Sequence, residues 1–111
     1  MRTADLPDTK QISGSPEATP TASRFPLGQI VATKGAVEAL LEAKMEADQL
    51  LLRHLKGDWG DLCESDKRLN EQALKEQTRL LSSYLLTTGE KIWIITEADR
   101  SVTTLLTPSE Y

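Results

Sequence analysis

Residues 80–107 carry the stretch that decides the fold, LLSSYLLTTGEKIWIITEADRSVTTLLT. Their β-branched and aromatic side chains predict three strands, at residues 80–86, 91–97 and 101–107. Gly89 lies in the first link, where a hairpin needs a residue that adopts positive φ. The second link, at residues 98–100, is short and polar. Short links of this kind join neighbouring strands into an antiparallel meander, which ends at Pro108 because proline cannot donate to a strand ladder.

Upstream, residues 34–56 contain no proline and repeat apolar side chains at helical spacing. The repeats are Val37, Leu40 and Leu41, followed by Leu51, Leu52 and Leu55. Thr33 is typical of a helix N-cap. We favour two helices with a joint near residues 44–48 over one long helix, which would expose leucines on opposite sides. Before Thr33, residues 29–32 are either a short strand or an extended lead-in.

A third helix is predicted to begin at residue 61, after a glycine-containing loop, and to end near residue 75. Asp61 and Glu64 have the spacing of a capping box, with aspartate as the N-cap. We expect Leu62, Leu69 and Ala73 to face inward. The sequence therefore predicts an α+β fold, with two or three N-terminal helices packed on a C-terminal three-stranded antiparallel meander.

The chain has 111 residues and a formal net charge of −4, which suits one small domain. Residues 1–24 hold three of the five prolines and no aromatic residue. We expect a disordered tail there, because this segment cannot bury enough apolar surface to offset the entropy lost on ordering. Residues 25–111 then form a single small α+β domain. This domain carries the whole net charge, since the charges of the tail cancel.

Composition excludes several classes of protein and site. An acidic domain is repelled by phosphates, so direct nucleic-acid binding is disfavoured. No secretory signal and no apolar run of about 20 residues is present, so we expect a cytoplasmic protein that does not contact membranes. Cys63 is the single cysteine, which rules out an internal disulfide and a cysteine-based zinc site. No cofactor or metal motif was found. We expect His54 to be structural, favoured at a helix end by the dipole, and pairing it with Cys63 as a nucleophile is the weaker alternative.

Two polar loops supply the candidate partner-binding residues. These are Asp58, Trp59 and Asp61 in the first loop and Glu97, Asp99 and Arg100 in the second. Trp59 is either an exposed anchor for a partner or a lid of the core. Arg100 has two alternatives as well: a partner contact, or an ion pair to Asp58, Asp61 or Glu97. If the loops meet, their four carboxylates could hold Mg²⁺ for phosphodiester chemistry.

Four segments resemble a family of small bacterial proteins. They are residues 27–33 (LGQIVAT), 57–62 (GDWGDL), 92–101 (IWIITEADRS) and 105–111 (LLTPSEY). These proteins are carried on plasmids and integrated mobile elements and are called plasmid-related or hypothetical. Family members usually have a Ser-Pro helix start where this chain has Glu46 and Ala47. The resemblance implies an accessory role and brings no catalytic or binding residue with it.

These observations favour a non-catalytic accessory or regulatory protein-binding module of a bacterial mobile element. Six carboxylates against three bases between Asp58 and Glu76 would present an acidic surface to a partner protein that is basic or associated with nucleic acid. A small metal-dependent nuclease or hydrolase that uses the clustered carboxylates is the alternative.

Overall fold

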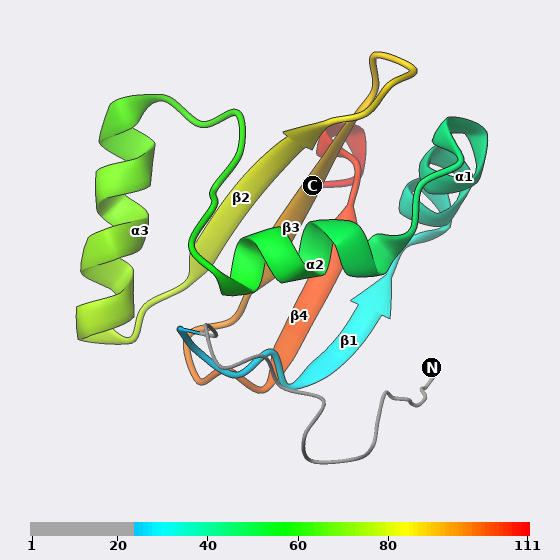
Figure 1. The fold of residues 1–111 in the computed structure, drawn as a ribbon. Coiled ribbons are helices and arrows are strands. Elements are labelled where there is room, and N and C mark those ends of the chain that lie inside the picture. The colour runs from blue at the N-terminus through cyan, green and yellow to red at the C-terminus, as the bar shows by residue number, and fades with distance from the viewer. Residues whose placement is uncertain (1–23) are drawn as a thin grey trace.

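A computed structural model of the protein describes residues 24–111 (Figure 1). The predicted disordered tail lies outside the described residues, apart from Arg24. The described part is α+β, as predicted. In chain order its elements are β1 (Gln29–Ala32), α1 (Lys34–Ala43), α2 (Ala47–Leu55), α3 (Glu64–Glu76), β2 (Leu80–Leu85), β3 (Lys91–Thr96), β4 (Val102–Leu106) and the 3-10 helix η2 (Pro108–Glu110). None of these helices is long and apolar enough to cross a bilayer.

The strands form one mixed sheet in the order β1-β4-β3-β2. β3 is antiparallel to both β2 and β4, so the three predicted strands do form a meander. The prediction of a three-stranded, purely antiparallel sheet is wrong, because β1 adds a fourth strand that runs parallel to β4. Gln29 pairs with Val102 in that ladder. The sequence left residues 29–32 ambiguous because their partner strand, β4, lies about 70 residues later in the sequence.

Residues 34–56 form two helices, as favoured from the sequence, and the joint lies at Lys44, whose φ of 57° ends α1. Thr33 is the N-cap of α1 and accepts a hydrogen bond from the Ala36 N–H. The predicted apolar stripe was wrong at Val37 and Leu41, which are both exposed. The buried face instead carries two alanines and Leu40, because small side chains let the helix approach β4 closely.

α3 begins later than predicted, at Glu64 with Cys63 as its N-cap. The predicted capping box is wrong: the Asp61 N–H donates to the Ser83 carbonyl at 2.7 Å instead of lying at a helix start. Leu69 was expected to face inward and is 61% exposed. The buried positions of α3 are Asn70 and Ala73. A polar residue therefore occupies a core-facing position that the apolar pattern assigned to its neighbour.

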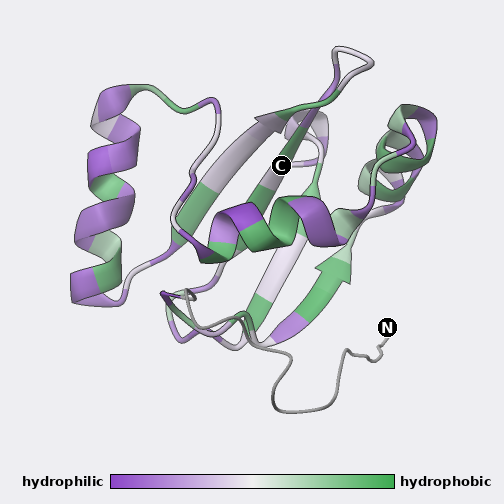
Figure 2. Cartoon of the chain, viewed as in Figure 1, coloured by the Kyte–Doolittle hydropathy of each residue, from purple (hydrophilic) through white to green (hydrophobic). Residues whose placement is uncertain are grey.

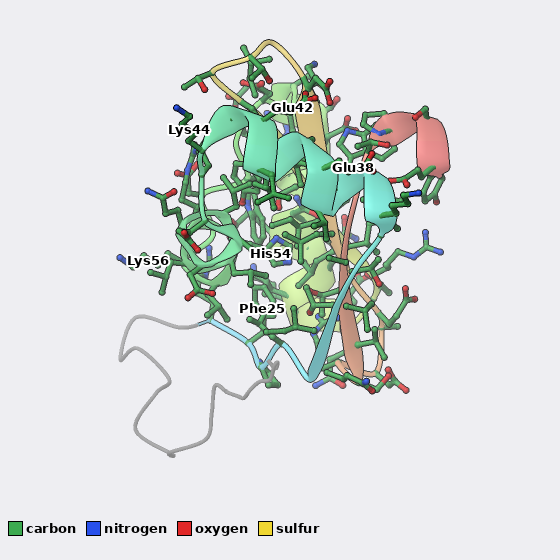
Figure 3. All side chains as sticks on the ribbon, turned by 90° about the vertical axis from the view of Figure 1, so that its right-hand side faces the viewer. Phe25, Glu38, Glu42, Lys44, His54 and Lys56 are labelled. Carbon is green, nitrogen blue, oxygen red and sulfur yellow. The ribbon has the colours of Figure 1, made fainter. Side chains whose placement is uncertain are left out.

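The helices cover one face of the sheet. α2 crosses that face, α1 lies at the C-terminal end of β1, and α3 lies beside β2 (Figure 1). Hydrophobic and hydrophilic residues alternate along α2, whereas α3 is largely hydrophilic (Figure 2). The main core contains Leu40, Leu50, Tyr84, Ile94 and Leu105, among others. No described α-helix covers the opposite face, where only η2 is seen in the perpendicular view (Figure 3).

The C-terminal segment fixes the junction between β1 and α1. The Glu110 carboxylate accepts hydrogen bonds from the N–H groups of Thr107 (2.9 Å) and Gly35 (3.0 Å) and from the Thr33 hydroxyl. These bonds, that from the Thr107 N–H above all, lower the pKa of Glu110 to about 2. The carboxylate is therefore charged across the neutral range and sits at the N-terminus of α1, where the helix dipole favours an anion.

The outer edge of β2 is closed by groups that imitate a neighbouring strand. The Asn70 amide donates to the Leu81 carbonyl at 2.6 Å and accepts from the Leu81 N–H at 3.1 Å. Further along, the Ser83 N–H donates to the Trp59 carbonyl at 3.1 Å. Gly60 permits this approach, since a Cβ there would lie 2.0 Å from the Ser83 carbonyl oxygen. The edge is therefore blocked against pairing with another strand.

Replacing Asn70 by alanine should lower the free energy of unfolding by about 2–4 kcal/mol, because it leaves the partly buried N–H and C=O of Leu81 unpaired. Urea unfolding measures the change. Gln72→Ala is the matched control on the exposed side of α3, where the Gln72 amide bonds only Glu76. Equal destabilisation by the two substitutions would contradict this role of Asn70.

Candidate functional site

Trp59 belongs to the loop that joins α2 to α3, and its side chain is buried in the core. Its side chain is 3% exposed, it stacks on Phe25 with ring centroids 6.3 Å apart, and its Nε1–H donates to Glu71 at 3.0 Å. Arg24 also binds Glu71, through two hydrogen bonds of 2.7 and 2.9 Å. The hydrogen bonds from Arg24 and then Trp59 lower the pKa of Glu71. The exposed-anchor interpretation of Trp59 is wrong, and its interpretation as a lid of the core is confirmed.

Asp58 is held by a neighbouring base. Its carboxylate accepts a 2.7 Å hydrogen bond from Arg53, which holds the pKa of the Asp58 carboxyl below its ordinary value. Arg53 also lies 4.7 Å from the centre of the Tyr84 ring, a cation–π contact. The Tyr84 hydroxyl donates to the Asp58 carbonyl at 2.7 Å, and burial raises the pKa of Tyr84 to about 12. Asp61, by contrast, has an exposed side chain and uses only its backbone in the β2 edge.

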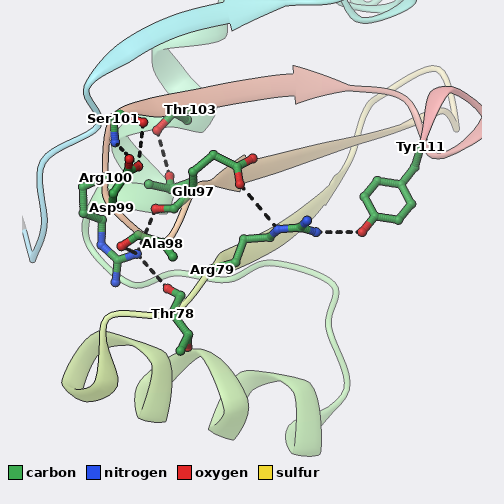
Figure 4. Close-up of polar contacts among 10 residues, drawn as sticks. Thr78, Arg79, Glu97, Ala98, Asp99, Arg100, Ser101, Thr103 and Tyr111 are labelled. Atoms are coloured by element: carbon green, nitrogen blue, oxygen red, sulfur yellow. Dashed lines mark hydrogen bonds and ion pairs between the residues drawn. The ribbon is translucent and has the colours of Figure 1, made fainter.

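Arg100 closes the C-terminal end of α3 (Figure 4). Its guanidinium donates to the carbonyls of Ala73 (3.2 Å) and Thr78 (2.7 Å), and to that of Glu97 at 3.1 Å. A cation at this position also complements the helix dipole. The predicted ion pair to Asp58, Asp61 or Glu97 is absent from the ion pairs of the described residues, because the guanidinium binds carbonyl oxygens instead. The φ of Arg100 is 62°, a strained value for a residue other than glycine.

The other two residues of this turn have local partners. Asp99 accepts hydrogen bonds from the Ser101 hydroxyl (2.6 Å) and N–H (3.0 Å), and the hydroxyl contributes most to lowering the pKa of Asp99. The Glu97 carboxylate lies 3.7 Å from Arg79, on the face of the sheet that the helices leave uncovered.

The two predicted loops are linked through an aromatic ring and not through carboxylates. Arg100 lies 5.8 Å from the centre of the Phe25 ring, which in turn stacks on Trp59. Within residues 24–111, no three acidic, histidine or cysteine side chains gather into a group that could hold a metal ion. The four carboxylates of the hydrolase alternative therefore do not converge.

A shallow cleft of about 310 Å³ opens beside this ring. It is lined by Arg24, Phe25, Pro26, Leu74, Gln77, Ala98, Asp99 and Arg100. The donors of Arg24 that face it bind Glu71, and those of Arg100 bind backbone carbonyls. The two arginines that line the cleft therefore stabilise the fold. The lining residues do not include a nucleophile paired with a base.

His54 lies in the core and takes part in a chain of polar groups. Its ring nitrogens lie 2.6 Å from the Ser82 hydroxyl and 2.9 Å from that of Thr96. Thr96 contacts the hydroxyl of Thr103, which donates to the Leu27 carbonyl at 2.7 Å. Burial, with a smaller contribution from the charge of Arg100, lowers the pKa of His54 to about 3. The structural role is confirmed, but the predicted stabilisation of a charged ring by the helix dipole is wrong.

Cys63 is not part of this hydrogen-bonded chain of polar groups. Both ring nitrogens of His54 are bound to hydroxyls, and the exposed Cys63 thiol lies 3.2 Å from the Ser65 hydroxyl. The Ser82 hydroxyl beside His54 resembles half of a catalytic dyad. Both side chains have 0% exposure, so no substrate can reach them.

The feature that sequence reasoning missed is the uncovered face of the sheet. Strand alternation sends Trp93 and Ile95 to this face, while Ile92 and Ile94 enter the core. By the same registers, this open face carries apolar and polar side chains alike, and Tyr111 packs on Trp93. The apolar ones are Val31, Leu81, Leu85, Trp93, Ile95, Val102 and Leu106, and the polar ones are Gln29, Ser83, Lys91 and Thr104. Of these, Ile95, Leu106 and Ser83 are buried. The uninterrupted apolar run at residues 92–95 was the available signal, because such runs are typical of strands covered on both faces.

Comparison with models of known protein families, with characterised proteins and with solved structures finds no match. The resemblance to plasmid-related proteins stays a prediction. The geometry of the described residues is therefore the basis for any functional proposal.

The free energy of unfolding should decrease as the pH is lowered through the range in which His54 is protonated only in the unfolded chain. The unfolded ring has its ordinary pKa of 6.5 and the folded ring a pKa of about 3, so the unfolded state gains the proton first. The contribution of the neutral His54 ring to the free energy of unfolding is present above pH 6.5 and is lost as the pH falls toward 3. Urea unfolding should show a loss of about 2 kcal/mol between roughly pH 7 and pH 5.

A His54→Gln variant should lose this pH dependence, whatever its absolute stability. Ring proton shifts of His54 in the wild-type protein should stay constant over the same range in NMR spectra. A ring that titrates near its ordinary pKa would contradict the buried neutral state.

Arg100→Ala should lower the free energy of unfolding by about 2 kcal/mol more than Gln77→Ala, because of these two side chains only that of Arg100 donates to carbonyls at the end of α3. Gln77 is a matched control, since its φ of 57° imposes the same strain on alanine. Chemical unfolding measures both variants. Equal losses would assign the effect to backbone strain and remove the capping role.

Proposed function

We propose that this protein is a non-catalytic protein-binding module and that the open face of its sheet is the docking surface. The observation that carries the proposal is the two-sided apolar character of β3. Ile92 and Ile94 are fully buried under the helices, and the half-buried Trp93 and the buried Ile95 place large apolar side chains on the other side. A strand of this composition suits a sheet covered on both faces.

Apolar side chains remain accessible on the open face. Leu85 is 57% exposed and Tyr111 is 70% exposed, while Trp93 is half-buried and its ring packs against that of Tyr111. Contiguous exposed apolar groups of this kind mark interaction sites on soluble proteins. Aromatic residues with a polar tip, such as Tyr111 and Trp93, supply much of the binding free energy in protein interfaces.

Three interacting polar side chains, those of Arg79, Glu97 and Tyr111, border this apolar surface (Figure 4). Arg79 donates to the Tyr111 hydroxyl at 2.8 Å and lies 3.7 Å from Glu97. Each of these side chains is exposed or half-exposed, so a partner can reach their remaining donors and acceptors. An apolar centre with a hydrogen-bonding rim is the usual anatomy of a protein interface.

Charge favours a basic partner. The chain carries a net charge of −4, and a field of that sign attracts a positively charged protein and repels nucleic acid. The acidic residues of α3 are partly compensated, as with Glu71 by Arg24 and Glu64 by Lys67. The proposed partner is therefore a protein with an apolar contact surface and net positive charge. An accessory role in a mobile element is the biological setting that the sequence resemblance suggests.

The experiment compares two matched substitutions, Leu85→Glu on the open face and Leu69→Glu on the outer side of α3, which are 57% and 61% exposed in the wild type. Proteins retained from a lysate of the native host by the wild-type chain are identified, purified and titrated by calorimetry. Leu85→Glu should weaken the complex at least tenfold, because it places a charge in the apolar contact. Leu69→Glu should leave the Kd within about twofold.

Trp93→Thr provides a second substitution on the same face, with circular dichroism as a check of folding. Retention of no partner, or equal loss of binding in the two glutamate variants, would contradict the proposal.

A further inference from the structure

We propose that two copies of this chain associate through their β1 strands, which pair antiparallel about a twofold axis and join the two sheets into one of eight strands. This surface is the edge of the sheet and not its open face, so the inference goes beyond the proposed function. Figure 3 views the molecule from the β1 side, with α1 crossing the C-terminal end of the strand.

β1 offers backbone groups that nothing else in residues 24–111 uses. The N–H groups of Gln29 and Thr33 donate to β4 at 2.8 and 2.9 Å. By strand alternation, the N–H and C=O of Ile30 and Ala32 point away from the sheet. β1 is the terminal strand of the sheet and pairs only with β4. Ile30 is 46% exposed and Ala32 is also exposed.

Among the residues that the structure describes, only the β1 edge of the sheet is open, because Asn70 and the loop at residues 59–61 close the edge of β2. Association through a single edge uses the same surface on both copies and closes after two chains. A sheet with two open edges would instead extend into a fibre. The closed edge therefore directs strand pairing to a dimer.

Backbone geometry fixes the register. Antiparallel strands exchange both hydrogen bonds between residues whose backbone groups point across the gap. These are Ile30 of each copy opposite Ala32 of the other, with the two Val31 residues facing each other at the twofold axis. Ile30 and Ala32 share the helix-covered face, and Val31 belongs to the open face. In this register the helix-covered faces of the two sheets therefore lie on the same side of the joined sheet, and so do the two open faces.

Charges at the two ends of β1 complement each other in this register. Lys34 follows β1 at the start of α1 and Gly28 precedes β1, so antiparallel pairing brings Lys34 of each copy toward the Gly28 end of the other. Gly28 is packed against the turn that carries Asp99, since a Cβ on it would lie 2.4 Å from the Ser101 carbonyl oxygen. Arg100 of that turn directs its guanidinium to α3, and the exposed Asp99 of the same turn is opposite in charge to Lys34 of the second copy. Exposed Val37 and Leu41 on α1 add apolar contact beside the strand.

Sedimentation equilibrium of the purified full chain tests the dimer. The wild type should approach twice its 12.3 kDa mass at micromolar concentration. Ile30→Lys should weaken the dimer at least tenfold, because it places a charge beside the paired strands. Leu52→Lys is the matched control, since Leu52 is 42% exposed on α2, and it should leave the dimer unchanged.

A charge exchange tests the register. Lys34→Asp should weaken the dimer several-fold, and the double variant Lys34→Asp with Asp99→Lys should restore it. A chain that stays monomeric at about 500 μM overturns the proposal. So does a dimer that Ile30→Lys leaves intact, or one that Leu85→Glu dissociates, which would assign association to the open face. These measurements need no second protein, so their failure is distinct from failure of the proposed function.

Discussion

The buried ring of His54 joins a helix to the sheet through a chain of hydrogen bonds. It lies on α2 and contacts hydroxyls on β2 and β3, and through Thr96 and Thr103 the same chain of polar groups reaches β4 and the segment before β1. Ser82, Thr96 and Thr103 would be costly in an apolar core without these partners. The ring must stay neutral to serve them, because a charge there would be desolvated with no carboxylate to pair it.

The polar residues that drew attention in the sequence hold the architecture together. Trp59 covers the smaller core cluster, Arg100 caps α3, and Asp58 pairs with Arg53. The same chemistry suits a binding site, since aromatic rings, guanidinium groups and carboxylates make the strongest polar contacts in either setting. Burial and the identity of the partner atoms distinguish the two uses. Here the partner atoms belong to the chain itself.

The surfaces left for interaction are set by what the helices and loops cover. Two helices cover one face of a sheet whose central strand is apolar on both faces, and α3 with its preceding loop closes the β2 edge. The open face and the β1 edge remain. Val31 belongs to both, so a dimer joined at the edge would present one continuous apolar surface formed by two sheets.

The sequence by itself determined the α+β class, the β2–β3–β4 meander and the Thr33 cap, and it favoured the division into two helices, because each depends on neighbours a few residues apart. Only the tertiary structure decided that residues 29–32 are a strand, that Asn70 and not Leu69 faces inward, and that Arg100 binds carbonyls of α3. Each of these rests on a contact between distant segments, such as Gln29 with Val102 or Asn70 with Leu81. A local sequence pattern does not indicate which distant backbone groups lack a hydrogen-bond partner. Asn70 and Arg100 have structural roles because they bind such groups.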